Sequence, residues 1–179
     1  MNWSAGRYVR QPPLQEKLAC TLVELFAMSL KCCGHPSELR CMEITAEEHV
    51  SQRAAEFVDG VPSAALDYSE ESLGRVTAVL AGMSEMFSGG QFPQALVEDA
   101  SCYLLEVARR EFGGVFKYHA PTEQLVLVTG MPNYEVSITA KAKVVGLLSG
   151  DLADDLAFHY SGFAERARSA KPGDVVMFV

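Results

Sequence analysis

The 179-residue chain lacks a hydrophobic run long enough to cross a membrane. Its most apolar stretch, LACTLVELFAMSL, covers 13 residues and is interrupted by Glu24, whereas a membrane-spanning helix needs about 20 apolar residues. Basic residues precede this stretch, as in a secretory signal, but no cleavage site of small residues follows it. We therefore expect the stretch to be a core helix of a cytoplasmic protein.

A surplus of positive charge is also missing. The chain has 15 Lys and Arg residues against 23 Asp and Glu residues, which gives a net charge of −8 at pH 7. Nucleic-acid binding requires basic side chains that neutralise phosphates, and anionic lipid surfaces attract basic segments. The charge balance therefore argues against nucleic-acid and membrane partners. Basic proteins, small cations or simple solubility remain as reasons for the acidic groups.

The cysteines form neither a disulfide framework nor a zinc knuckle. Their number, five, is odd and two of them are adjacent, which favours a reducing compartment. Four possible soft-metal ligands lie within ten residues, but adjacent side chains leave a helix end in different directions and do not converge as zinc requires. We expect buried thiols and a surface histidine, with no metal or cofactor. The four residues are Cys32, Cys33, His35 and Cys41.

Motifs of known catalytic chemistry are absent from the sequence as well. It contains no G-x-S-x-G elbow, no P-loop and no dinucleotide-binding fingerprint. A cysteine nucleophile would need an oriented histidine beside it, and the spacing brings none of His49, His119 or His159 to a thiol. We therefore predict a protein without enzymatic activity. A cysteine- or metal-dependent enzyme stays open only through the cysteine cluster.

The sequence does contain amphipathic segments with start and stop signals. After an irregular arm at 1–13, apolar steps of three and four predict helices over 14–31, 46–58, 70–87 and 94–112. Glycine and proline follow these segments and end them.

Two helix starts are marked by capping residues. Thr45 followed by Glu48 resembles a capping box. In the stretch ALDYSEESLGRV, Ser69 is a strong N-cap, and Glu70 and Glu71 lie in the first turn, where the helix dipole favours negative charge. We interpret this stretch as the start of a helix and not as a site.

The amino-acid composition changes at residue 115, where β-branched and aromatic residues become frequent. The segments VFKYHA, QLVLVTG and YEVSITA, separated by turn residues, predict an antiparallel meander. Helices are expected over 139–149 and 151–168, and DVVMFV is a last strand that closes the sheet. The prediction is one α+β domain over 1–179, with N-terminal helices packed on a short antiparallel sheet of about three or four strands, followed by C-terminal helices and a final strand.

Acidic residues supply the candidate site. Glu106 lies among apolar residues and needs a partner, either Arg109, Arg110 or a backbone amide of the meander, so it is expected to lock its helix to the sheet. The other acids crowd helix starts, where they complement the dipole, and a divalent-metal site would instead need carboxylates on opposed elements. If a basic protein binds, such helix starts present their carboxylates outward. The candidate partner-binding residues are Glu47, Glu48, Asp151, Asp154 and Asp155.

Three stretches together resemble a group of small, uncharacterised bacterial proteins with LDYS-x-x-SL and GEV-x-x-x-x-x-GG motifs. They are LDYSEESLGRV, YLLEVARREFGG and ITAKAKVVGLLSGDLADDLAFHY, within residues 65–165. The chain departs from the pattern at Leu105, where glycine is expected, and at Phe116, where tryptophan is commoner. The resemblance implies no activity. It implies a compact domain of the kind found beside toxin and secretion genes, including immunity proteins that bind and block a toxin.

The expected function is therefore that of an immunity protein that neutralises a cognate toxin by direct binding. The alternative is a secretion chaperone or adaptor, which would also be small and acidic but would carry an effector without neutralising it. Self-association into a homo-oligomer is compatible with both.

Overall fold

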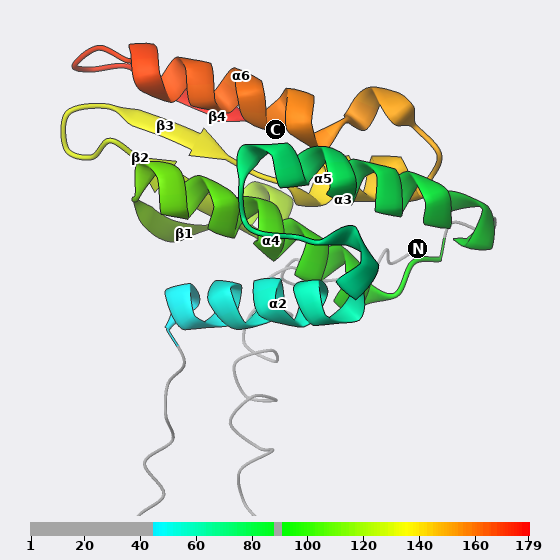
Figure 1. Cartoon of the computed structure of the whole chain (residues 1–179). Coiled ribbons are helices and arrows are strands. Elements are labelled where there is room, and N and C mark those ends of the chain that lie inside the picture. Colours follow the sequence, from blue (N-terminus) through cyan, green and yellow to red (C-terminus); the bar gives the residue numbers. More distant parts are fainter. Residues whose placement is uncertain (1–44, 88–90) are drawn as a thin grey trace, which may run out of the picture. The chain divides into compact units, whose positions relative to one another are not determined.

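The computed structural model describes residues 45–87 and 91–179, which form five α-helices and a four-stranded mixed sheet (Figure 1). This confirms the α+β prediction. The predicted arm at 1–13, the helix at 14–31 and the cysteine cluster lie outside the described residues. The helices are α2 (Ala46–Gly60), α3 (Glu70–Met83), α4 (Gln94–Phe112), α5 (Lys141–Leu148) and α6 (Leu156–Ser169), and the strands are β1 (Val115–His119), β2 (Gln124–Thr129), β3 (Glu135–Ile138) and β4 (Val175–Phe178).

Local capping explains where the first helices begin. At α2, the Thr45 hydroxyl accepts from the Glu48 N–H at 3.1 Å while the Glu48 carboxylate accepts from the Thr45 N–H at 2.9 Å, so the predicted capping box is present. At α3, the Ser69 hydroxyl accepts a backbone N–H from the first turn. The predicted helix 70–87 ends earlier, at Met83, and continues as the 3₁₀ helix η2 (Ser84–Phe87).

The sheet has the strand order β1-β2-β3-β4, and its last strand corrects the sequence prediction. The pairs β1–β2 and β2–β3 are antiparallel as expected, but β4 runs parallel to β3. Two helices connect β3 to β4, and such a crossover returns the chain in its original direction. The sheet is therefore mixed and not purely antiparallel.

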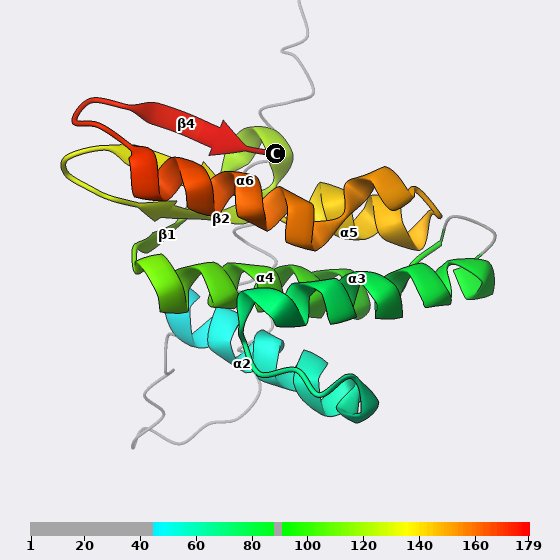
Figure 2. The same cartoon turned by 45° about the horizontal axis from the view of Figure 1, so that its top comes forward.

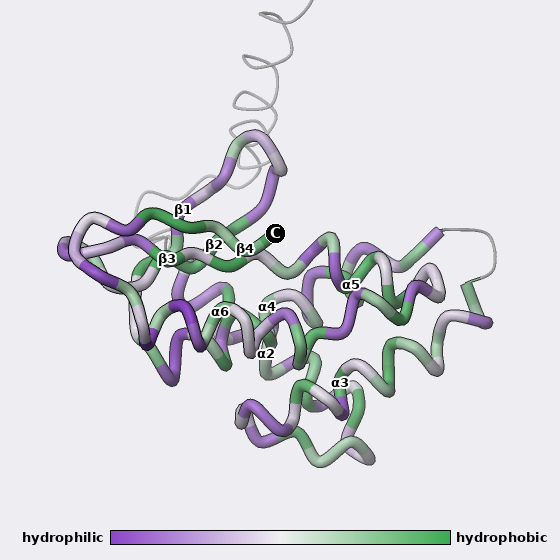
Figure 3. The backbone as a smooth tube through the Cα atoms, turned by 90° about the horizontal axis from the view of Figure 1, so that it is seen from above, coloured by the Kyte–Doolittle hydropathy of each residue, from purple (hydrophilic) through white to green (hydrophobic). Residues whose placement is uncertain are grey.

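Helices α4 and α6 pack on the same face of the sheet, α2 lies against α4, and α3 lies against α6 (Figures 1 and 2). The strands turn a row of apolar side chains towards α4 and α6, and hydrophobic stretches run along β2 and β4 (Figure 3). Tyr103 of α4 and Tyr160 and Phe163 of α6 are among the largest fully buried side chains. The core thus extends from the sheet through α4 and α6 to α2, α3 and α5, which contribute buried residues such as Val50, Leu73 and Leu147.

The segment predicted as one helix over 151–168 is divided in the structure. A 3₁₀ helix, η4 (Leu152–Asp154), is followed by α6, and the predicted helix 139–149 is the shorter α5. Asp155 separates η4 from α6 with a non-helical backbone conformation (φ −56°, ψ 121°) and serves as the N-cap of α6. The prediction of a single helix is wrong because this second cap interrupts it.

Candidate functional site

Two of the three aspartates predicted as partner-binding residues begin helices, and the third, Asp154, is the last residue of η4. Asp151 accepts a backbone N–H of η4 at 3.0 Å, and Asp155 accepts the N–H of Phe158 at 3.0 Å at the start of α6. Asp154 is different, because its carboxylate lies 3.0 Å from the ammonium group of Lys143. Asp154 and Asp155 are both partly buried, whereas Asp151 is exposed. The three are therefore not equivalent.

The position of Asp154 is built into the packing of α5 against η4. A Cβ atom at Gly146 of α5 would lie 1.7 Å from the Asp154 carboxylate, so the Asp154 side chain would have to move if position 146 carried one. With its charge held by Lys143 and its side chain packed against a helix backbone, Asp154 acts as a structural residue. Within the described residues, Asp151 and Asp155 are the two of these aspartates that no salt bridge engages.

Two large apolar side chains accompany these carboxylates on the surface. Leu152 is 70% exposed and Phe158 is 77% exposed. Glu165, two turns further along α6, is also exposed. Protein-binding surfaces combine an aromatic or aliphatic anchor with a polar rim, and a few such anchors carry most of the binding energy. We name this set the Phe158 surface, which consists of Asp151, Leu152, Asp155, Phe158 and Glu165.

A groove of about 310 Å³ runs beside the Phe158 side chain. Gly162 forms part of its wall. A Cβ atom at this position would lie 3.3 Å from the ring of Phe178, so glycine leaves space in the groove that a side chain would fill. Residues that line the groove include Asp155, His159, Glu165 and Phe178.

His159 is the buried polar residue of this groove, with 8% of its surface exposed. Its Nε2 lies 2.8 Å from the carbonyl oxygen of Thr139. Because a carbonyl oxygen can only accept, Nε2 carries the ring proton and Nδ1 has a lone pair. Burial lowers the pKa of His159 below its ordinary value, although the hydrogen bond to Thr139 opposes this in part. The imidazole is therefore neutral near pH 7.

Leu152, Phe158 and Glu165 were not among the predicted partner-binding residues, although the sequence contains a signal for Phe158. The buried residues Leu156, Tyr160 and Phe163 follow each other at steps of four and three along α6. Phe158 and Glu165 fall on a different stripe with the same spacing. A phenylalanine off the apolar stripe of an amphipathic helix indicates a surface anchor.

Glu47 and Glu48, the other predicted partner-binding residues, are engaged at the start of α2. Glu48 belongs to the capping box, and Glu47 lies 2.8 Å from Arg109 of α4. Figures 1 and 2 place the start of α2 on the other side of the unit from the connection between α5 and α6. The structure therefore does not bring Glu47 and Glu48 together with Asp151, Asp154 and Asp155.

Glu106 organises the region between α2 and α4. Its side chain is 1% exposed and accepts from the guanidinium groups of Arg109 and Arg110 at 2.8 Å and from the Ser51 hydroxyl of α2 at 3.4 Å. Burial alone would raise the pKa of Glu106, but the hydrogen bonds from both arginines outweigh burial and lower the pKa. The predicted arginine partners are correct. The predicted lock to the sheet is wrong, because the long-range contacts are with α2.

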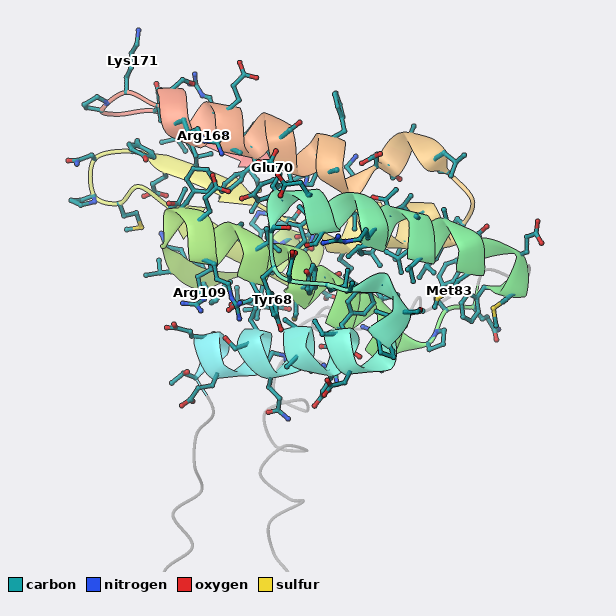
Figure 4. The ribbon with its side chains drawn as sticks, in the orientation of Figure 1. Tyr68, Glu70, Met83, Arg109, Arg168 and Lys171 are labelled. Atoms are coloured by element: carbon teal, nitrogen blue, oxygen red, sulfur yellow. The ribbon has the colours of Figure 1, made fainter. Side chains whose placement is uncertain are left out.

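The aromatic ring of Tyr68 packs beside the residues around Glu106. Figure 4 shows Tyr68 and Arg109 between α2 and α4. Tyr68 has a left-handed backbone conformation (φ 61°), which is strained for a residue with a side chain. Its ring stacks on that of Tyr103 at 5.0 Å, and the guanidinium carbon of Arg110 lies 3.5 Å from its ring centroid. Its N–H also donates to the Tyr103 hydroxyl at 2.9 Å, so these contacts hold the conformation in place. We refer to Glu47, Ser51, Tyr68, Glu106, Arg109 and Arg110 as the Glu106 cluster.

The rest of the stretch ALDYSEESLGRV has the structural role that was predicted for it. The Ser69 hydroxyl caps α3 and also donates to the Asp67 carboxylate at 2.6 Å. Glu70 lies 3.9 Å from Arg168 of α6, and Figure 4 shows this pair between the two helices. The stretch therefore begins α3 and connects this helix to α6 through an ion pair.

Cys102 lines a separate cavity of about 130 Å³ that His49 also lines. The structure thus places one histidine and one thiol in the same cavity, which the sequence spacing did not indicate. Burial raises the pKa of the Cys102 thiol to about 12, so the thiolate required of a nucleophile is not formed near neutral pH. This arrangement does not support cysteine catalysis.

Within residues 45–87 and 91–179, no three His, Cys, Asp or Glu side chains are grouped closely enough to hold a metal ion. In the same ranges, no helix combines the length and apolarity needed to span a bilayer. Comparisons of the chain with protein-family models, with curated proteins and with solved structures gave no match.

Proposed function

We propose that the protein is a non-enzymatic, cytoplasmic immunity protein that neutralises a basic bacterial toxin by binding it directly through the Phe158 surface. One observation carries the proposal, namely that Phe158, which is 77% exposed, lines one groove together with Asp155 and Glu165. Asp151 and Leu152, which is 70% exposed, closely precede them in the chain.

The apolar part of this surface gives a reason for binding. Complete burial of a phenylalanine or leucine side chain contributes about 1.5–3 kcal/mol. Leu152 and Phe158 leave most of that contribution unused in the isolated chain. A partner that covers both side chains gains this free energy, so they are the expected hot spots of the interface.

The charged part gives a reason for a basic partner. Within the described residues, no salt bridge engages Asp151, Asp155 or Glu165, in contrast to Asp154 with Lys143. Acidic groups at the edge of an interface accelerate the approach of a basic protein. The net charge of −8 adds to this attraction. The resemblance to small bacterial proteins encoded beside toxin genes supports a toxin as that basic partner.

The test is co-expression of the protein with the products of its neighbouring genes, with survival of the host cells as the measurement. We expect one neighbouring product to be toxic alone and harmless together with the protein. Replacement of Leu152 and Phe158 by alanine should abolish protection. Met86→Ala is the matched control, because Met86 is 76% exposed but belongs to η2, outside the Phe158 surface.

Two outcomes would contradict the proposal. Protection that survives the double substitution would exclude the Phe158 surface. Stable capture of a neighbouring product without any neutralisation would indicate the chaperone or adaptor function instead.

A further inference from the structure

The groups around the groove beside Phe158 have one chemical property in common, which is that they accept hydrogen bonds or attract positive charge. Asp155 uses Oδ1 to cap α6, and none of the described residues donates to its Oδ2. Glu165 forms neither a hydrogen bond nor a salt bridge with any residue in the described ranges. The exposed ring of Phe158 offers a π face to cations.

His159 is an independent observation that points the same way. It is more than nine-tenths buried and lines the groove, and its Nε2 proton is used by the Thr139 carbonyl. Its Nδ1 therefore has a lone pair, and no residue of the described part of the chain donates to it. Nδ1 is not among the fully buried atoms that lack a hydrogen-bond partner, so it is an acceptor open to water or to a ligand at the groove.

Lys143 is the residue that could oppose a cation here. Among the described residues that line the groove, it alone carries a permanent positive charge. Its ammonium group is held at 3.0 Å by Asp154, which balances the charge. The two remaining carboxylates, those of Asp155 and Glu165, leave the groove negative.

We propose that this groove binds the side chain of an arginine of the protein partner. The planar guanidinium group stacks on the ring of Phe158 and donates to the carboxylate of Asp155, with Nδ1 of His159 as a further acceptor. Glu165 lies ten residues beyond Asp155, about 15 Å along the helix, and adds its negative charge to the attraction of a cation. A guanidinium has five N–H donors in a fixed plane and stacks on aromatic rings, whereas the lysine ammonium is a compact and strongly hydrated charge. A groove of about 310 Å³ has room for the side chain. This inference rests on the proposed function, since it names the partner chemistry of the same surface.

The test uses the complete chain and a small probe, Nα-acetyl-arginine methylamide, and follows backbone amide signals by NMR at constant ionic strength. We expect the signals of Phe158, His159 and Gly162 to shift in a saturable way. The citrulline analogue has nearly the same shape without the charge and should bind about tenfold more weakly, as expected for the loss of charge-assisted hydrogen bonds. The lysine analogue should also bind more weakly than the arginine probe.

The chain offers a matched pair of variants for this titration. Asp155→Asn keeps a good N-cap but removes a carboxylate from the groove, and should weaken the arginine probe about tenfold. Asp151→Asn makes the same change at the cap of η4, outside the groove lining, and should change the affinity by less than about twofold. Phe158→Leu should weaken the probe as well, because it removes the ring and keeps an apolar side chain.

Equal binding of the arginine and citrulline probes would overturn the inference, and so would equal binding of the arginine and lysine probes or equal effects of the two asparagine variants. The titration does not use the toxin, so its failure is distinct from failure of the proposed function. Selective arginine binding without neutralisation of any toxin would support this site and refute the immunity function. Neutralisation that depends on Phe158, in a protein that does not bind the arginine probe, would refute this site alone.

Discussion

The Glu106 cluster and the Phe158 surface both contain acidic residues at helix starts, but they use them differently. In the Glu106 cluster, the carboxylates of Glu47 and Glu106 are paired with arginines, and the one strained residue, Tyr68, is covered by Tyr103 and Arg110. In the Phe158 surface, Asp151 and Asp155 cap helices and stand beside side chains that are more than two-thirds exposed. Charges satisfied within the fold stabilise it, while charges left beside exposed apolar anchors are available to a partner.

The largest expected effect on stability is that of replacing Glu106, and Glu165 is the glutamate with which we compare it. Glu106→Gln should lower the free energy of unfolding by about 2 kcal/mol, because it removes the buried counter-charge that Arg109 and Arg110 share. The loss stays below that of a fully buried pair, since Arg109 keeps its ion pair with Glu47 and the side chains of Arg109 and Arg110 are 26% and 48% exposed and can turn to water. Glu165→Gln should change the free energy by less than about 0.5 kcal/mol. Urea denaturation of both variants measures the difference, and equal midpoints would remove the distinction between the two regions.

The next effect concerns the start of α3, next to the Glu106 cluster. Ser69→Ala should destabilise the protein by about 1 kcal/mol through loss of the cap, and Ser69→Asp should restore nearly all of this. Thermal melting of the three proteins checks the prediction. An unchanged melting curve for Ser69→Ala, together with loss of partner binding, would show that Ser69 acts in binding and not in stabilising the fold.

A smaller effect appears when the solution is acidified. The pKa of Glu106 is lower in the folded chain than its ordinary value of 4.5, so the unfolded chain binds the proton more readily. The stability that this residue contributes is present above pH 4.5 and is lost as the pH falls through its folded pKa. Glu106→Gln should therefore lose less stability than the wild type on acidification. Urea denaturation midpoints of both proteins, measured across this pH range, test the prediction. Parallel plots of midpoint against pH would contradict the pairing of Glu106 with the two arginines.

The smallest expected effect on stability is that of Phe158→Ala. Because the side chain is 77% exposed, its removal should change the free energy of unfolding by less than about 0.5 kcal/mol. Denaturation in urea gives the value. A loss of several kcal/mol would show that Phe158 supports the fold, and loss of toxin protection could then no longer be attributed to the interface.

Features set by neighbouring residues could be predicted from the sequence. Thr45 and Ser69 mark the starts of α2 and α3, the bounds of α4 agree with the predicted helix 94–112, and three strands were expected where β1, β2 and β3 lie. Each of these follows from a cap, a glycine or a periodic pattern within one segment.

Features that join distant segments could not be predicted in the same way. The hydrogen bond from Ser51 to Glu106 spans 55 residues, and that from His159 to Thr139 spans 20. The parallel pairing of β4 depends on how α6 packs against the sheet. The groove beside Phe158 depends on two chain segments, since Phe178 follows Gly162 by 16 positions and faces it only in the folded chain.

The most direct test of the account is the rate at which the protein associates, at two ionic strengths, with the toxin that we propose as its partner. One variant carries Asp151→Asn, Asp155→Asn and Glu165→Gln, and a control with the same change in net charge carries Glu47→Gln, Glu48→Gln and Glu56→Gln. We predict that the first variant associates several-fold more slowly than the wild type at low salt and that high salt removes most of the difference, because ions screen exposed charges. The control should associate nearly as fast as the wild type. If both variants slow association equally, or if neither responds to salt, the Phe158 surface is not where the partner is captured.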